Sequence, residues 1–181
     1  MRLPALTELT PRQQEISDSI AAKRGATRGP FLIWLRSPEL AEKVDAYCRF
    51  DPSINERLRE LSLLIAARHF DAQYSWNTHD KKAIAADVSA ESIKELANNG
   101  VPHFAHADEQ LLYSFATQIL RDHFVDQKTF DAADAEWGEA GLHHRLPGQL
   151  LHAGDAAQYL PGGPEGGRPA ALPGRARLRQ G

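Results

Sequence analysis

Glu60 and His79 are the two residues whose types and placement best suit proton-transfer chemistry. Each lies in one of two consecutive segments that are predicted to be helical, so the two side chains can face each other where the helices cross. An imidazole group has an ordinary pKa of about 6.5 and carries protons near neutral pH, while an adjacent carboxylate orients the ring. The pair can equally be a satisfied polar contact between packed helices, and both interpretations stay open at this stage.

Two helices are predicted within residues 53–87, and they must position this pair. Ser53 is a suitable N-cap for the first helix, and Glu56 stands three residues later, where it would complete a capping box. The second helix is expected to begin near Ala72. An apolar stripe on the first helix has the spacing of a buried face: Leu58, Leu61, Leu64 and Ile65. Three residues share one face of the second: Ala72, Ser75 and His79.

The spacing of Glu60, positions 72 and 75, and His79 resembles a known signature. It is the Glu-x(11)-Cys-x-x-Cys-x-x-x-His motif in the peroxidase branch of the carboxymuconolactone decarboxylase and alkyl hydroperoxidase D-like superfamily. Ala72 and Ser75 stand at the two cysteine positions. The Tyr-Ser-Trp-Asn-Thr-His run and the small residues after it look like the decarboxylase-like branch. The resemblance covers roughly residues 6–142 and includes GPFLIWLRSPELAEKV.

This resemblance implies an alkyl hydroperoxidase D-like helical bundle and a cofactor-free lyase acting on a small carboxylated, lactone-type substrate. Decarboxylation of such a molecule leaves an electron-rich, dienolate-like intermediate that must be protonated at carbon. That step needs a positioned acid and a charge-stabilising donor. By resemblance, His79 is the proton donor, Glu60 is its partner and Tyr74 supplies a hydroxyl group. The resemblance also implies a homo-oligomer, a trimer or a hexamer.

Two other functions remain as alternatives. A peroxidase-like antioxidant of the family would need a reactive thiolate and a second cysteine. Ala72 has no nucleophile, Ser75 cannot form a disulfide, and Cys48 is expected on a different helix without a partner, so this alternative is disfavoured. The other alternative is a non-catalytic helical oligomerisation module that keeps the fold without the reaction.

Three aromatic residues have two interpretations each. By resemblance, Phe31 and Trp34 line a pocket near the active-site entrance, and Trp76 shapes its wall. They can instead be aromatic residues of the core or of a subunit interface. No metal site is predicted, because His103-x-x-His106 has no evident third ligand. No cofactor is expected.

The rest of residues 1–142 also reads as helical. No segment shows convincing period-2 alternation, so the chain is predicted to be all-α. Residues 23–30 are predicted to be a basic connector, most simply an ordinary loop, although its glycines would also allow the backbone to approach another element or a ligand closely. The expected helices are Pro11 to about Ala22 with Thr10 as cap, Pro38 to about Phe50, Ala90 to about Asn98 between Ser89 and Gly100, Asp108 to about His123, and Gln127 to about Glu139 with Asp126 as cap. Their predicted buried residues include Leu111, Leu112, Phe115, Ile119, Leu120, Phe130, Ala133 and Trp137.

The composition is that of an ordinary globular protein: 181 residues, 42% hydrophobic and 25% charged. No apolar run is long enough for a membrane span, and no signal peptide is evident at the N-terminus. A single cysteine excludes an intrachain disulfide and fits the cytoplasm. The net charge of −3 gives no general attraction to nucleic acid. Two basic pairs are interpreted as solvated faces: Arg57 with Arg59, and Lys81 with Lys82.

Residues 143–181 differ from the rest of the chain. They contain eight of the 13 glycines, five of the 11 prolines, and five arginines against Asp155 and Glu165, which gives this segment a charge of +3 and leaves −6 for residues 1–142. A segment rich in Gly and Pro and poor in large apolar side chains buries too little apolar surface to offset the conformational entropy lost on ordering, so it is predicted to be a disordered tail. An apolar helix that the family places here is absent. A reading-frame shift near Leu142 is one hypothesis, with a natural tail or a spliced variant as alternatives.

Overall fold

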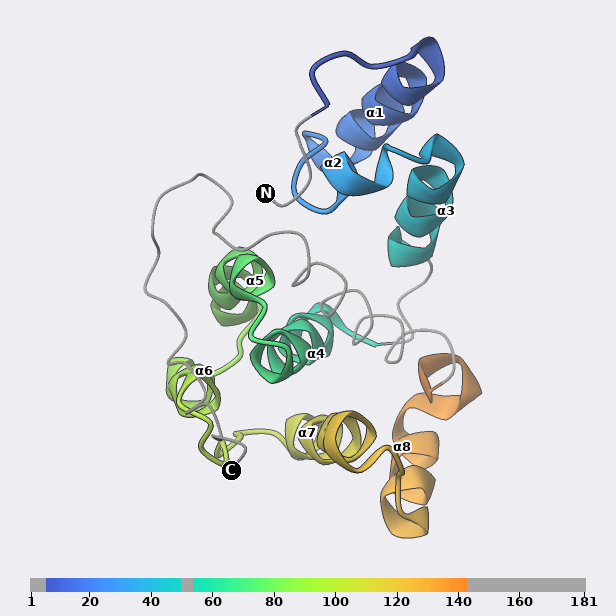
Figure 1. The fold of residues 1–181 in the computed structure, drawn as a ribbon. Coiled ribbons are helices and arrows are strands. Elements are labelled where there is room, and N and C mark those ends of the chain that lie inside the picture. The colour runs from blue at the N-terminus through green and yellow to red at the C-terminus, as the bar shows by residue number, and fades with distance from the viewer. Residues whose placement is uncertain (1–5, 50–53, 143–181) are drawn as a thin grey trace, which may run out of the picture.

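The computed structural model describes residues 6–49 and 54–142, and this part of the chain is all-α, without strands (Figure 1). The prediction of an all-α class is therefore confirmed for these residues. The predictions for the tail, including the frame shift, lie outside the described residues. The elements in chain order are α1 (Pro11–Arg24), α2 (Phe31–Trp34), α3 (Pro38–Arg49), α4 (Glu56–His69), α5 (Gln73–Ala85), α6 (Ala90–Ala97), α7 (Ala107–Thr117), the π-helix η1 (Gln118–Asp122) and α8 (Gln127–Ala140).

Side-chain caps fix the starts of two helices as the sequence predicts. The Thr10 side chain accepts a hydrogen bond from the Gln13 amide, and the Gln13 side chain bonds back to the Thr10 amide, a complete capping box before α1. The Asp126 side chain accepts from the Thr129 amide before α8. Ser89 holds the N-cap position of α6, although its side chain makes no capping bond.

Two predicted helix boundaries are wrong. Asn55 caps α4 by accepting from the Leu58 amide, so Glu56 is the first helical residue and cannot close a box with Ser53, which lies outside the described residues. Asn is as good an N-cap as Ser, and Asn55 directly precedes the first helical residue. After α6, the left-handed residue is Asn99, with φ of 58°, and not Gly100. Asn tolerates this conformation because its short polar side chain can bond locally.

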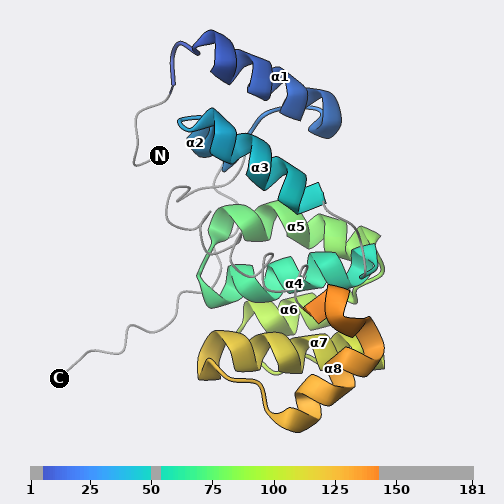
Figure 2. The same cartoon turned by 90° about the vertical axis from the view of Figure 1, so that its right-hand side faces the viewer.

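The central helix is α4, which packs against α5, α6 and α7, while α8 packs on α7 (Figures 1 and 2). Its predicted apolar stripe is confirmed, because all four members are buried. The prediction that Phe130 is buried is wrong: this residue is 38% exposed, whereas Ala133 and Trp137 are buried as predicted. Phe130 sits in the first turn of α8, and the buried face begins at Ala133.

The hydrophobic residues form two clusters. The larger belongs to α4–α8 and includes Leu61, Leu64 and Leu112. The smaller belongs to α1–α3 and consists of Ile16, Ile20, Phe31, Trp34, Leu35 and Ala41. Figure 2 shows α1–α3 stacked above α5. Within the described segments, no helix is both long and apolar enough to cross a membrane.

Candidate acid–base site

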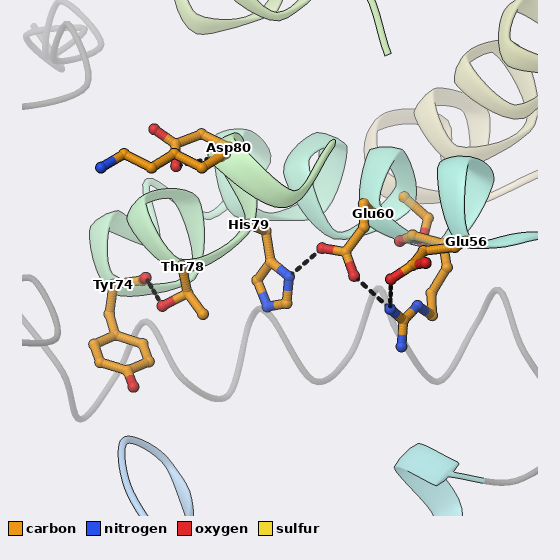
Figure 3. Close-up of polar contacts among 9 residues, drawn as sticks. Glu56, Glu60, Tyr74, Thr78, His79 and Asp80 are labelled. Atoms are coloured by element: carbon orange, nitrogen blue, oxygen red, sulfur yellow. Dashed lines mark hydrogen bonds and ion pairs between the residues drawn. The ribbon is translucent and has the colours of Figure 1, made fainter. Parts of the chain in front are cut away.

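Glu60 of α4 and His79 of α5 meet, with 2.6 Å between Glu60 Oε2 and His79 Nδ1. Figure 3 shows the two side chains pointing toward each other. The geometry follows from the packing of α4 on α5, because each residue lies on the face that its helix turns to the other. The Glu60 side chain is only 1% exposed to solvent, whereas the His79 side chain is 16% exposed. The juxtaposition of these two predicted residues is therefore observed.

Arg59 engages the other oxygen of the carboxylate. Its Nη2 lies 2.8 Å from Glu60 Oε1 and 3.0 Å from Glu56 Oε1 (Figure 3). Both oxygens of Glu60 thus have a cationic or potentially cationic partner. The interpretation of Arg57 and Arg59 as solvated faces is wrong, because Arg57 Nη2 also pairs with Asp108 Oδ2 at 2.8 Å. Helical periodicity misses such contacts, since a long arginine side chain reaches across to a neighbouring face.

The electrostatic balance keeps Glu60 ionised. Burial alone would raise the pKa of Glu60, but the hydrogen bond and charge of His79, with smaller contributions from Arg59 and Lys82, hold it below its ordinary value. A buried carboxylate is tolerated when its oxygens are paired in this way. An ionised Glu60 favours a hydrogen on Nδ1 of His79, because a carboxylate can only accept.

The second nitrogen of the imidazole is the one placed to react. Nε2 of His79 makes no hydrogen bond with any described residue, while Nδ1 is committed to Glu60. A carboxylate that holds Nδ1 orients the ring. The arrangement can therefore present Nε2 as a proton donor or acceptor toward a bound molecule.

The Tyr74 side chain does not lie beside the Glu60–His79 pair. It lies five residues before His79, roughly 140° around the helix, so the two side chains leave α5 in different directions. Its ring is buried, and its hydroxyl lies against Gly29, just before α2. A Cβ on Gly29 would clash with that oxygen, so this connector glycine comes close to another element, the less favoured of the two interpretations of the connector. Burial raises the pKa of the Tyr74 phenol, so the group stays neutral.

The three aromatic candidates pack into the cores. Trp76 belongs to the larger cluster, and Phe31 and Trp34 belong to the smaller one, with their rings edge to face at 5.1 Å. The guanidinium of Arg24 lies 4.6 Å from the centre of the Phe31 ring. Of the two interpretations of these residues, the packing favours core positions.

The positions of the family cysteines hold no sulfur. Ala72 is the N-cap residue of α5, and Ser75 is buried in its first turn. Cys48 lies on α3, as expected. In residues 6–49 and 54–142, no three His, Cys, Asp or Glu side chains are grouped so that they could hold a metal ion. His103 pairs instead with Glu95, at 3.1 Å, on an exposed loop.

No protein-family profile, no curated protein and no solved structure matches this chain.

Proposed function

We propose that this chain is a carboxymuconolactone decarboxylase-like protein with an alkyl hydroperoxidase D-like bundle, in the branch that lacks the cysteine pair. In this proposal it is a cytoplasmic homo-oligomer, a trimer or hexamer, and acts as a cofactor-free lyase on a small carboxylated lactone. The observation that carries the proposal is the 2.6 Å contact between His79 Nδ1 and Glu60 Oε2.

The proposed step is loss of carbon dioxide followed by protonation at carbon. The bond from the substrate to its carboxylate carbon breaks, and its electron pair enters the conjugated lactone to give a dienolate. His79 Nε2–H then gives its proton to a ring carbon, and the neutral imidazole regains a proton from solvent. Glu60 holds Nδ1 throughout and stabilises the imidazolium before transfer, which makes it a positioning residue.

Three features of the site support this step. Glu60 is buried and ionised, so its orientation is fixed and its charge is little screened. The His79 side chain retains partial exposure, so a small molecule can approach it. Ala72 and Ser75 offer no thiolate, which removes the dithiol mechanism of the peroxidase branch.

The test is the rate of carbon dioxide release from carboxymuconolactone by the full chain and its variants. His79→Ala and Glu60→Gln are each expected to slow release by about 10²-fold or more, the usual contribution of a positioned acid or base. The matched control is the other Glu–His pair in the described residues, Glu95 with His103, whose His side chain is 91% exposed. Glu95→Gln and His103→Ala should leave the rate unchanged.

Equal rates in wild type and His79→Ala would overturn the proposal and leave a helical module without this reaction. The oligomeric state is measured separately by size-exclusion chromatography coupled to light scattering. A trimer or hexamer is expected, and a monomer would contradict that part of the proposal.

A further inference from the structure

The proposed reaction needs a group that stabilises the dienolate, and the residues assigned so far do not supply one. Loss of carbon dioxide places negative charge on the carbonyl oxygen of the lactone, and a cation or hydrogen-bond donor at that oxygen lowers the barrier. The Tyr74 hydroxyl does not lie beside the acid–base pair. Arg59 is already engaged by Glu56 and Glu60. A further cation near His79 is the remaining possibility.

Lys82 follows His79 by one turn of α5. Residues three apart on a helix have Cβ atoms about 5–6 Å apart and lie about 60° from each other around the axis. The preceding Lys81 lies roughly 160° from His79, on the other side of the helix. Of these two lysines, only Lys82 is therefore placed to reach the face on which His79 meets Glu60.

The ammonium group of Lys82 is not neutralised by a neighbour. This residue is exposed and makes no ion pair within residues 6–49 and 54–142. None of the positions three or four residues away, which could pair with it along the helix, is acidic: Thr78, His79, Ala85 and Ala86. Asp80 is the nearest acid in sequence, and Figure 3 shows it on the opposite side of α5 from His79. The charge of Lys82 is therefore available to a bound molecule.

The charge of Lys82 also acts on the acid–base pair. Burial would raise the pKa of Glu60, and Lys82 is among the charges that lower it, after those of His79 and Arg59. A lysine ammonium has three donors on a flexible four-carbon stem. It can therefore meet an oxygen of a molecule that is bound at Nε2 of His79.

We propose that Lys82 binds the carbonyl oxygen of the lactone and stabilises the negative charge that develops on it. This inference rests on the proposed function. The electron pair of the bond broken to carbon dioxide moves through the conjugated lactone onto this oxygen. It returns to form the new C–H bond when His79 gives its proton to carbon. Lys82 keeps its protons throughout, so it acts by charge and not as a second acid.

The first experiment compares the steady-state kinetics of carbon dioxide release from carboxymuconolactone by the full chain and two variants. Lys82→Gln is expected to lower kcat by about 10²-fold with little change in KM, because the charge on the carbonyl oxygen is absent in the bound substrate. Lys81→Gln is the matched control and should leave both constants unchanged. Wild-type kcat in Lys82→Gln, with or without a change in KM, would overturn the inference.

A second measurement does not depend on turnover. Tetronate is a lactone enolate that is anionic at neutral pH, so it mimics the dienolate, whereas 2(5H)-furanone is a neutral lactone with the same ring. Titrations are followed through amide resonances of the full chain. Lys82→Gln is expected to weaken tetronate binding about tenfold, the effect of losing one charge-assisted hydrogen bond. Furanone binding should be the same in both proteins, and Lys81→Gln should bind tetronate as wild type does.

The two measurements separate failure of this inference from failure of the proposed function. Carbon dioxide release and tetronate binding that are both unaffected by Lys82→Gln would overturn the role of Lys82 and leave the proposed reaction intact. Tetronate binding that depends on Lys82, without carbon dioxide release by wild type, would overturn the reaction and support Lys82 as the group that binds an enolate oxygen. Absence of tetronate binding to wild type would overturn the inference.

Discussion

The carboxylate of Glu60 is almost completely removed from solvent, and each of its oxygens meets a nitrogen of a basic side chain. One partner, Arg59, is its neighbour in sequence, and the other, His79, comes from the next helix. Removing one member of a buried pair leaves the other charge without compensation, which costs more than the intact pair contributes. The same contact is therefore expected to affect stability as well as chemistry.

Glu60→Gln is expected to lower the free energy of unfolding at neutral pH by about 2–4 kcal/mol. Because the folded pKa of Glu60 lies below its ordinary value of 4.5, its contribution is present above that pH and is lost as the pH falls through the folded pKa. Urea unfolding measured at neutral pH and in acid checks both points. The variant should lose less stability in acid than wild type. Glu91→Gln, on the exposed face of α6, is the control, and an equal acid loss in Glu60→Gln and wild type would contradict the account.

Gly29 offers a second prediction at the level of single residues. Its φ is +62°, and an added Cβ would meet the Tyr74 hydroxyl at 2.2 Å, so Gly29→Ala suffers both backbone strain and a steric clash. Gly25→Ala is a matched control, because Gly25 has φ of +80° and nothing near its missing Cβ. Gly25→Ala should cost about 1 kcal/mol and Gly29→Ala about 2–4 kcal/mol in thermal or urea unfolding. Equal destabilisation by the two variants would contradict this prediction, because it would mean that the Tyr74 ring moves aside without a loss of stability.

At the scale of elements, α4 is held to α7 by charge as well as by apolar packing. Arg57 contacts Asp108 Oδ2 and Glu109 Oε1, each at 2.8 Å, at the start of α7. Glu109 is 1% exposed, so it depends on this arginine for compensation. The acidic first turn also suits the positive end of the α7 dipole.

Arg57→Ala is therefore expected to destabilise the protein by about 2–4 kcal/mol, because it leaves the Glu109 carboxylate buried without its cation. The comparison is Arg12→Ala, which breaks the exposed pairs with Glu15 and Glu42 and should cost much less, because exposed ion pairs contribute little. Chemical unfolding of the two variants measures the difference. If the two costs are the same, the α4–α7 ion pairs do not contribute as described.

Sequence patterns predicted most helices but not their long-range polar contacts. The α4 stripe and the Thr10 and Asp126 caps follow from local spacing. The meeting of Glu60 with His79 is the exception among the long-range contacts, because it was predicted from their places on consecutive helices and from the resemblance to a known signature. The contact of Arg57 with α7 joins residues 51 positions apart, and periodicity carries no information about the reach of a side chain. The π turn at residues 118–122 has no sequence signal of the kind used for caps or strands, so it was not predicted.

At the scale of the whole molecule, the two hydrophobic clusters suggest unequal stability. The α1–α3 cluster is the smaller, and it is accompanied by a buried aspartate, Asp45, which is 2% exposed. Asp45 Oδ1 lies 2.6 Å from Arg24 Nε, and Oδ2 lies 2.9 Å from Arg49 Nη2 and 3.7 Å from Lys23 Nζ. The pairs with Arg24 and Lys23 connect α3 to the end of α1, and the pair with Arg49 lies within α3.

Asp45→Asn is expected to speed amide hydrogen exchange in α1 and α3 while leaving the slowest amides of α4 and α7 unchanged. The reason is that a small cluster that loses a buried charge partner can open locally before the rest of the protein unfolds. Exchange followed by mass spectrometry on peptides from each helix checks this. Equal acceleration in all helices would mean that the described helices open as one cooperative unit.

The most direct test of the central claim is proton exchange at carbon, measured without any decarboxylation. An unsaturated lactone that lacks the carboxyl group is incubated with the full chain in heavy water. Deuterium uptake at its ring carbons is followed by proton NMR spectroscopy. If His79 is the proton donor, uptake depends on the protein, falls by about 10²-fold or more in His79→Gln and is unchanged in His103→Ala. Uptake at the same rate with His79→Gln as with wild type would contradict the assignment of proton transfer to this histidine.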